Sequence, residues 1–257
     1  MTPPATALRD TYLVFRRYAR QTLRNKPSVI ISMVQPVLYL VLFGPMMRAA
    51  LSGHGGAPAD PWRVFVPGIL VQLGLFSASF AGFKIIPEQR WGVVERMRVA
   101  PLRRTALLAG RVAHDAVQLV VQGTLILLVG VAFGMRMPVF AAALCLVLVA
   151  LLGVGLASLS YALGLVLQSE YQFAPVLQTT TLPLMLLSGI LLPMSLAPAW
   201  LDAVSHLSPF RYVVDAMRAV AAGDYTGVTP MTGMAVALAL AVAALAYGTR
   251  VFRRRSA

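Results

Sequence analysis

The chain has 257 residues, of which 58% are hydrophobic and only 12% are charged. An ordinary soluble domain carries about a quarter charged residues, and a helix that crosses a bilayer needs roughly 20 apolar residues in succession. Six stretches at least that long lack Asp, Glu, Lys and Arg: 27–47, 64–83, 116–135, 137–169, 171–201 and 225–249. A soluble helical protein could bury one or two of them but hardly six, so the composition predicts an all-α integral membrane protein.

The first predicted element is an amphipathic helix within residues 1–27, on the cytoplasmic side. Its apolar residues recur at three- and four-residue spacing among arginines, which is typical of a helix lying in the membrane interface: Leu8, Tyr12, Phe15, Ala19 and Leu23. Five basic residues are spread through 11–27, where a signal peptide would need its apolar core. We therefore expect this segment and the first span to be retained.

Six transmembrane helices are expected to follow within a single domain over residues 1–257. Their predicted ranges are 28–49, 64–86, 106–133, 139–167, 173–193 and 229–249. The segment 194–224 is half apolar and is interrupted by Pro198 and Pro209. It therefore predicts one or two short interfacial or re-entrant helices on the outer side.

The basic residues are distributed unevenly between the two sides that these spans define. Three blocks share one side: residues 9–26, residues 84–111 and residues 250–255. They hold 17 of the 22 basic residues, and Arg48, Arg63, Arg136, Arg211 and Arg218 lie on the other side. The positive-inside rule then predicts cytoplasmic N- and C-termini. The net charge of +13 is explained by topology and by attraction to anionic membrane lipids, and no nucleic-acid partner is expected.

Several kinds of chemistry are missing from the sequence. No phosphate-binding loop of the form G-x-x-x-x-G-K-[ST] occurs, because Lys26 is followed by proline and Lys84 by isoleucine. Cys145 is the sole cysteine, and the three histidines are scattered over separate segments. We therefore expect no catalytic residue, no metal site and no cofactor bound by this chain.

Polar residues at membrane depth are functional candidates by default. The third predicted span contains Arg111, His114 and Asp115, and the first and last are four residues apart, so they can pair along one helix face. A structural anchor near the cytoplasmic end is the favoured interpretation, and a substrate or proton role is the alternative. On the outer side, a solvated helix face is expected for a second polar group: Asp202, His206, Arg211, Asp215 and Arg218.

Residues 88–99, in the cytoplasmic connection between spans two and three, are hard to explain by topology alone. If helical, they place Glu88, Gly92 and Glu95 along one face and Trp91 on another. Orientation would need only the arginines, whereas Trp and Arg are the usual anchors of protein interfaces. We favour docking of a protein partner here, with a lipid-surface helix as the alternative.

Two motifs resemble those of the type 2 ABC exporter permeases, in particular the daunorubicin-resistance branch. The first is EQRWGVVERMRVAPLRRTALLAGR at 88–111, where an acidic and basic lead-in precedes G-x-x-E-R and a proline. The matching positions are Glu88, Arg90, Gly92, Glu95, Arg96, Pro101 and Arg104. The second is LLSGILLPMSLAPAWLDAVSHLSPFRYVVDAMRA at 186–219, which is similar to the family's S-G-x-x-x-P, P-x-W-L and P-x-x-Y-x-x-D-A-x-R pattern. Trp91 stands where a small or polar residue is usual.

The resemblance implies a permease subunit that exports a drug, an antibiotic or a lipid-like molecule across the bacterial cell membrane. Two six-span subunits, identical or related, would pair with two copies of a separate ABC ATPase that binds ATP and Mg. Residues 88–99 would be the coupling helix that sits in a groove of this ATPase, with Trp91 among its contacts. Spans two and five would line the cargo cavity, with contacts from Phe76, Phe80, Thr180, Met185 and Leu186.

Two other classes of function stay open from the sequence. A proton-coupled secondary transporter would use Asp115 as its coupling group, and a membrane-embedded enzyme would need an assembled dyad or carboxylate cluster at membrane depth. The cargo and the choice between homodimer and heterodimer are not encoded in any motif. A strong preference for arginine over lysine suggests a GC-rich bacterial genome.

Overall fold

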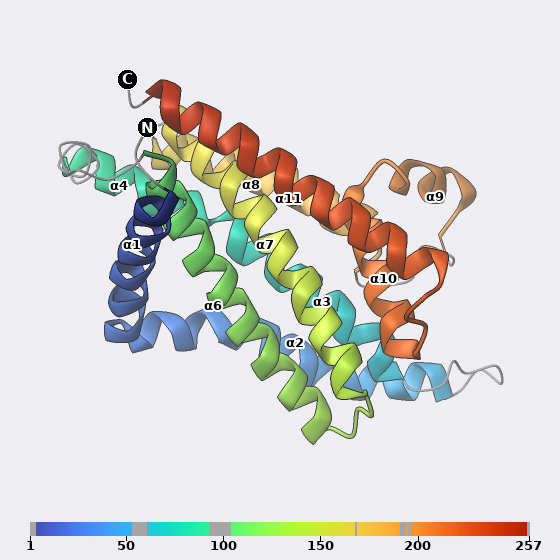
Figure 1. Ribbon diagram of the computed structural model, residues 1–257. Helices are drawn as coiled ribbons and strands as arrows, with labels where there is room; N and C mark the ends of the chain where they lie inside the picture. Colours follow the sequence, from blue (N-terminus) through green and yellow to red (C-terminus); the bar gives the residue numbers. More distant parts are fainter. Residues whose placement is uncertain are drawn as a thin grey trace.

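The computed structural model describes residues 4–52, 61–92, 104–167, 169–190, 194 and 197–255. All regular elements in these ranges are helices (Figure 1), which confirms the all-helical class for this part of the chain. They are α1 (Pro4–Arg24), α2 (Lys26–Ser52), α3 (Pro61–Ser79), the 3-10 turn η1 (Ala81–Lys84), α4 (Ile85–Arg90), α6 (Arg104–Ala132), α7 (Val139–Leu167), α8 (Glu170–Leu187), α9 (Ala199–Ser205), α10 (Pro209–Ala222) and α11 (Val228–Arg255).

Four helical segments of the described chain are long and apolar enough to cross a membrane. They are Trp62–Arg90, Thr105–Ala132, Val139–Leu167 and Val228–Arg254. Helix α2 has a shorter apolar stretch, Met33–Leu42, and α8 is interrupted by the polar run 178–181 and by Pro175 and Pro183. The structure therefore supports a polytopic membrane protein, with four of the six predicted spans apolar over a full crossing length.

The helices alternate in direction between two ends of the bundle, which we call the α1 end and the α10 end. At the α1 end, Gly248 near the close of α11 lies against Ser158 of α7 and Leu108 near the start of α6. At the α10 end, the Arg63 guanidinium donates to the carbonyl of Arg136, in the turn between α6 and α7. Figure 1 shows both chain termini at the α1 end.

Helix α1 packs on α6 with a different face from the one its apolar residues suggest. Val14 and Tyr18 are buried, whereas the predicted apolar positions Leu8, Tyr12 and Leu23 are among the exposed side chains. The buried positions are four apart, as expected for one helix face. Leu8, Tyr12 and Leu23 therefore point away from the bundle and are free to contact lipid, whereas Phe15 and Ala19 are half-buried and the Phe15 ring centroid lies 6.3 Å from that of His114 in α6.

The contact between α1 and α6 depends on Gly110. A Cβ at this position would lie 2.6 Å from Val14 Cβ and 2.8 Å from the carbonyl oxygen of Thr11. We expect Gly110→Ala to loosen α1 from α6, and exposed Arg16, Arg17 and Arg20 should then be cut by trypsin several times faster than in the parent chain.

Gly130→Ala is the matched control on the same helix. Its Cβ would meet only the flexible end of Met135, at 3.3 Å, and a Val66 methyl at 3.4 Å. Trypsin cleavage within α1 should stay at the parent rate in this variant. Equal cleavage of both variants would show that the close approach at Gly110 does not hold α1 in place.

The second predicted span is not a uniform helix. It runs through α3, η1 and α4, and the Ser160 hydroxyl of α7 bridges the break by donating to Ser79 O and accepting from the Gly82 N–H. Gly82 is pressed so closely on α7 that a Cβ would lie 2.0 Å from the Ser160 carbonyl oxygen. These two hydrogen bonds, which we call the Ser160 staple, hold the break between α3 and α4 against α7.

The polar residues of α9 and α10 form the expected solvated face only in part: the side chains of Asp202, His206 and Asp215 are 37%, 53% and 40% exposed, whereas the two arginines are largely buried. Arg218 is 12% exposed and donates to the carbonyl oxygens of Val64, Gly189 and Ile190. Arg211 is 13% exposed and pairs with Asp202 at 2.7 Å. Burial raises the pKa of the Asp215 carboxyl, although the neighbouring guanidinium groups of Arg218 and Arg211 act to lower it. These arginines join α10 to the start of α3, to the residues that follow α8, and to α9.

Candidate functional site

A buried ion pair lies where α4 meets α1 and α6. Arg111 Nη2 of α6 is 2.7 Å from Glu88 Oε2 of α4, and the two side chains are 2% and 15% exposed. The Tyr18 hydroxyl of α1 donates to the same carboxylate at 3.1 Å. Burial raises the pKa of Tyr18 above its ordinary value, so its hydroxyl stays protonated and remains a donor.

The Arg111 guanidinium also contacts aromatic rings from two helices. Its central carbon is 5.1 Å from the ring centroid of Tyr18 and 5.8 Å from that of Tyr161 in α7. Cation–π contacts of this kind strengthen when water is excluded. Arg111 therefore joins α1, α4 and α7 to α6 through a single side chain.

Asp115 forms a second buried group one turn along α6. Tyr161 donates to its Oδ2 at 2.6 Å, and Lys84 Nζ lies 3.4 Å from its Oδ1. His114 Nδ1 is 3.2 Å from the same Oδ1, and its Nε2 is 2.9 Å from the Thr22 hydroxyl of α1. We call the eight side chains of the two groups the polar cluster: Tyr18, Thr22, Lys84, Glu88, Arg111, His114, Asp115 and Tyr161.

The expected pairing of Arg111 with Asp115 is not formed. Arg111 turns to Glu88, and Asp115 turns to Tyr161, His114 and Lys84. The physical reason is that each charge finds an opposite charge on another helix. Such pairs hold helices together, whereas a pair within α6 would not. This arrangement favours the anchor interpretation of Arg111, His114 and Asp115.

The charged connection does not begin as one continuous helix over 88–99. Helix α4 ends at Arg90, the Gly92 N–H donates to the Gln89 carbonyl, and Gly92 has φ 65°, a left-handed conformation that favours glycine. The face predicted to carry Glu88 together with Gly92 is therefore broken. Glu95, Arg96 and Pro101 lie outside the described residues, and Arg104 is the first residue of α6.

The described part of this connection separates into inward and outward residues. Glu88 faces the bundle, where its carboxylate forms an ion pair with Arg111 and accepts a hydrogen bond from Tyr18, so it is not a surface contact. Trp91 is 72% exposed, as expected for an anchor residue. Arg90 is largely exposed, with Glu170 of α8 4.0 Å away. Trp91 and Arg90 are therefore the described residues of this segment that a partner could reach.

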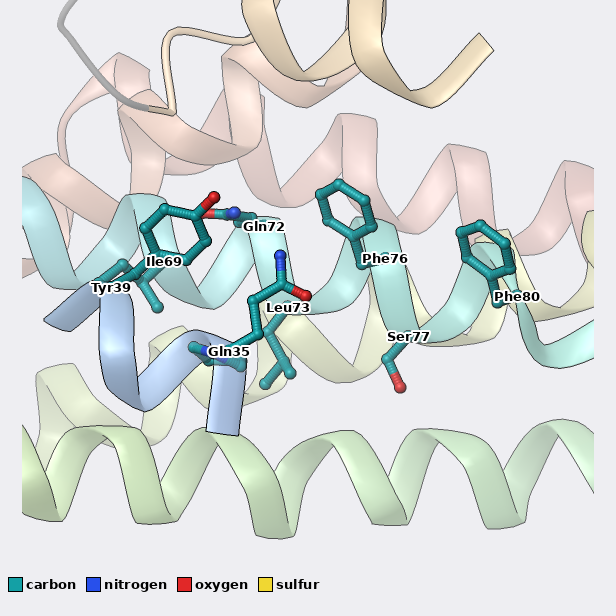
Figure 2. Close-up of a pocket in the computed structure, with 9 residues that line it drawn as sticks. Gln35, Tyr39, Ile69, Gln72, Leu73, Phe76, Ser77 and Phe80 are labelled. Atoms are coloured by element: carbon teal, nitrogen blue, oxygen red, sulfur yellow. The ribbon is translucent and has the colours of Figure 1, made fainter. Parts of the chain in front are cut away.

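A cavity of about 310 Å³ lies between α2 and α3. Figure 2 shows Gln35 and Tyr39 of α2 beside Gln72 and Phe76 of α3 and Phe80, the residue that follows α3, with the two phenylalanines on the same side. The lining is apolar and aromatic, with two amides and two hydroxyls, from Tyr39 and Ser77. Pockets for small molecules generally combine these features.

The structure brings only part of the predicted cavity set together. Phe76 and Phe80 line the cavity between α2 and α3, whereas Thr180, Met185 and Leu186 lie on α8, away from its lining. The Thr180 hydroxyl donates to Val176 O of its own helix, and Leu186 is 59% exposed. The cavity within one chain is therefore formed by the first and second predicted spans.

Several residues of these sites were not predicted from the sequence. Tyr18 and Thr22 lie off the apolar stripe of α1, and Gln35, Tyr39 and Gln72 are polar groups inside apolar runs. A usable signal did exist for Tyr161, because it is the sole tyrosine in the charge-free stretch 137–169. A buried tyrosine usually needs a hydrogen-bond partner.

The fold and the polar cluster define a helical membrane protein with a charged connection on one side. Comparison with known families goes further: residues 9–221 match the family described as ABC-2 type transporter, and the chain belongs to this family.

Named relatives agree with this membership. The chain is 27% identical over 213 residues, 82% of this chain and 73% of the relative, to a protein of Cyanophora paradoxa named as the transport permease ycf38. It is 25% identical over 224 residues, 83% of this chain and 75% of the relative, to the daunorubicin resistance ABC transporter permease protein DrrB1 of Streptomyces coeruleorubidus. It is 23% identical over 236 residues, 90% and 82% of the two chains, to a Mycobacterium tuberculosis protein named as a doxorubicin resistance ABC transporter permease, DrrC.

Proposed function

We propose that this chain is the permease subunit of an ATP-driven exporter that moves a hydrophobic or amphipathic molecule out of the cytoplasm or the inner leaflet. The family membership and the drug-resistance names of two relatives support a transport role. In this proposal α2 and α8 also cross the membrane, which gives six spans with both termini in the cytoplasm. The alternating directions of the helices are compatible with this number.

The proposal assigns ATP hydrolysis to a separate ABC ATPase, which binds ATP and Mg. The sequence lacks a phosphate-binding loop, and permeases of this class generally work with such an ATPase. Two permease chains, identical or related, would assemble with two ATPase copies in the bacterial cell membrane. This chain itself would be non-catalytic.

The connection of the polar cluster to the charged segment is the observation that carries the proposed mechanism. Glu88 lies three residues before Trp91, and its carboxylate binds Arg111 of α6 and Tyr18 of α1. A partner that displaces Trp91 would therefore pull on α4, and the buried ion pair would pass the movement to α1 and α6. Buried, fully packed contacts transmit such displacements because interiors deform little.

The lining of the cavity between α2 and α3 supports the proposal of a hydrophobic or amphipathic cargo. Phe76 and Phe80 offer apolar contact, and Gln35, Gln72 and Ser77 offer hydrogen bonds. This combination fits an amphipathic molecule better than a small ion. A proton-coupled transporter would instead use Asp115, but that carboxylate is already bound by Tyr161, His114 and Lys84.

Trp91→Ala tests the proposal that the ATPase moves this chain through contact with Trp91. Since Trp91 is 72% exposed, its removal should leave the fold intact. Buried tryptophan anchors at interfaces are each worth about 2 kcal/mol or more. We expect the stimulation of the cognate ATPase by this permease in proteoliposomes to fall at least tenfold.

Trp200→Ala is the matched control, because Trp200 is 69% exposed but lies on α9, away from the charged connection. ATPase stimulation should be unchanged in this variant. If Trp91→Ala stimulates the ATPase as well as the parent chain does, residues near 91 are not the coupling contact.

A further inference from the structure

A second cavity, of about 400 Å³, lies at the α1 end, and the proposed function assigns it no ligand. Its walls come from α1, η1, α4, α6 and α7. Part of the wall is the outer edge of the polar cluster, and the rest is formed by aromatic and amide side chains. We call it the α1 cavity.

Lys84 is the cationic group of this cavity that has N–H donors left for a ligand. Its side chain is 57% exposed, and its one partner among the described residues is Asp115 Oδ1, at 3.4 Å. An ammonium group carries three N–H donors, so Lys84 can bind a second anion without leaving Asp115. The cavity's two carboxylates are already paired, Glu88 with Arg111 and Asp115 chiefly with Tyr161.

Further donors face the same space. The side-chain amides of Gln21, Asn25 and Gln118 line the α1 cavity, and none forms a hydrogen bond with another described side chain. Phe83 and the exposed Trp91 supply an apolar border beside these donors. A ligand with a negatively charged, hydrogen-bonding head and an apolar body would match both parts.

The position of the cavity identifies where such a ligand comes from. Lys84 lies near the end of the apolar segment Trp62–Arg90, beside α1, whose Leu8, Tyr12 and Leu23 are exposed. Lys84 is therefore expected at the depth of the lipid headgroups, on the side of the membrane that the positive-inside rule predicts to be cytoplasmic. We propose that the α1 cavity binds the phosphate headgroup of an anionic phospholipid, with Lys84 as its charged contact.

Tryptophan quenching by lipid tests this proposal without ATP, ATPase or transport, so its failure would leave the proposed function standing. The full chain carrying Trp200→Phe keeps Trp91 at the cavity, and Trp62 is 2% exposed and gives a constant background. It is reconstituted in phosphatidylcholine vesicles with increasing phosphatidylglycerol, either lipid being brominated in the upper acyl chain. We expect phosphatidylglycerol to quench Trp91 several-fold more effectively than phosphatidylcholine.

Lys84→Gln should reduce that preference about fivefold, because a charge-assisted hydrogen bond is lost at a partly exposed site. Lys84→Arg should retain it and also verify that the fold tolerates a change at this position. Arg253→Gln removes a positive charge from exposed helix surface at the same end and should have no effect. Equal quenching by the two lipids would overturn the proposal. So would a preference that survives Lys84→Gln, or quenching by phosphatidylglycerol that inorganic phosphate alone abolishes.

Discussion

Arg111→Met is expected to lower the free energy of unfolding by about 3 kcal/mol. Removing one partner of a buried ion pair leaves the other charge without compensation, which typically costs about 3 to 5 kcal/mol. The lower value applies because Glu88 is 15% exposed and keeps its hydrogen bond from Tyr18. Methionine approximates the length of the aliphatic part of arginine, so the main loss is electrostatic. Unfolding in mixed micelles, followed by circular dichroism, measures the change.

The double variant Arg111→Met with Glu88→Gln separates the charge from the packing. Without the carboxylate, the buried uncompensated charge disappears, and we expect more than half of the lost stability to return. If the double variant is as unstable as the sum of the two single variants, Arg111 and Glu88 do not interact energetically.

Gly82→Ala should destabilise the second span by about 2 to 3 kcal/mol. Its new Cβ would lie 2.0 Å from the Ser160 carbonyl oxygen and 2.4 Å from the carbonyl carbon, both backbone atoms that cannot rotate away. The break at η1 would have to move off α7, which costs the hydrogen bond between the Gly82 N–H and Ser160 Oγ. The midpoint of unfolding in mixed micelles, followed by circular dichroism, measures the loss of stability.

Gly74→Ala is the control within the same span. The nearest atom to its Cβ would be Leu152 Cβ, at 4.0 Å, which is ordinary contact. Replacement of a helical glycine by alanine in free space adds up to about 1 kcal/mol of helix propensity. Gly74→Ala should therefore be neutral or stabilising. If Gly74→Ala loses as much stability as Gly82→Ala does, the close contact between Gly82 and Ser160 is not the cause of the loss.

The class of fold was predictable because lipid imposes a simple rule on sequence. Apolar stretches long enough to cross the bilayer mark the helices, and α7 occupies the predicted range 139–167. The rule is weaker for α8, where Gln178 and the three threonines at 179–181 interrupt the apolar run. It also says nothing of breaks such as η1, which depend on one hydroxyl from another helix.

The site was predictable only where residues act through their own segment. The exposure of Trp91 followed from its place in a charged connection. The partners of Arg111 and Asp115 did not follow, because spacing along α6 identifies neighbours on one helix and not those on α1, α4 and α7. The same limit explains Glu88, assigned to a partner surface from the motif but directed inward by a contact with α6.

ATP-dependent movement of amphipathic fluorescent compounds into inside-out proteoliposomes tests the central claim most directly. Vesicles hold this chain, its cognate ABC ATPase, or both. The account predicts accumulation of at least one compound only when both chains and ATP are present, and loss of that accumulation with Trp91→Ala. Accumulation driven by a proton gradient in vesicles that hold this chain alone, and abolished by Asp115→Asn, would contradict it.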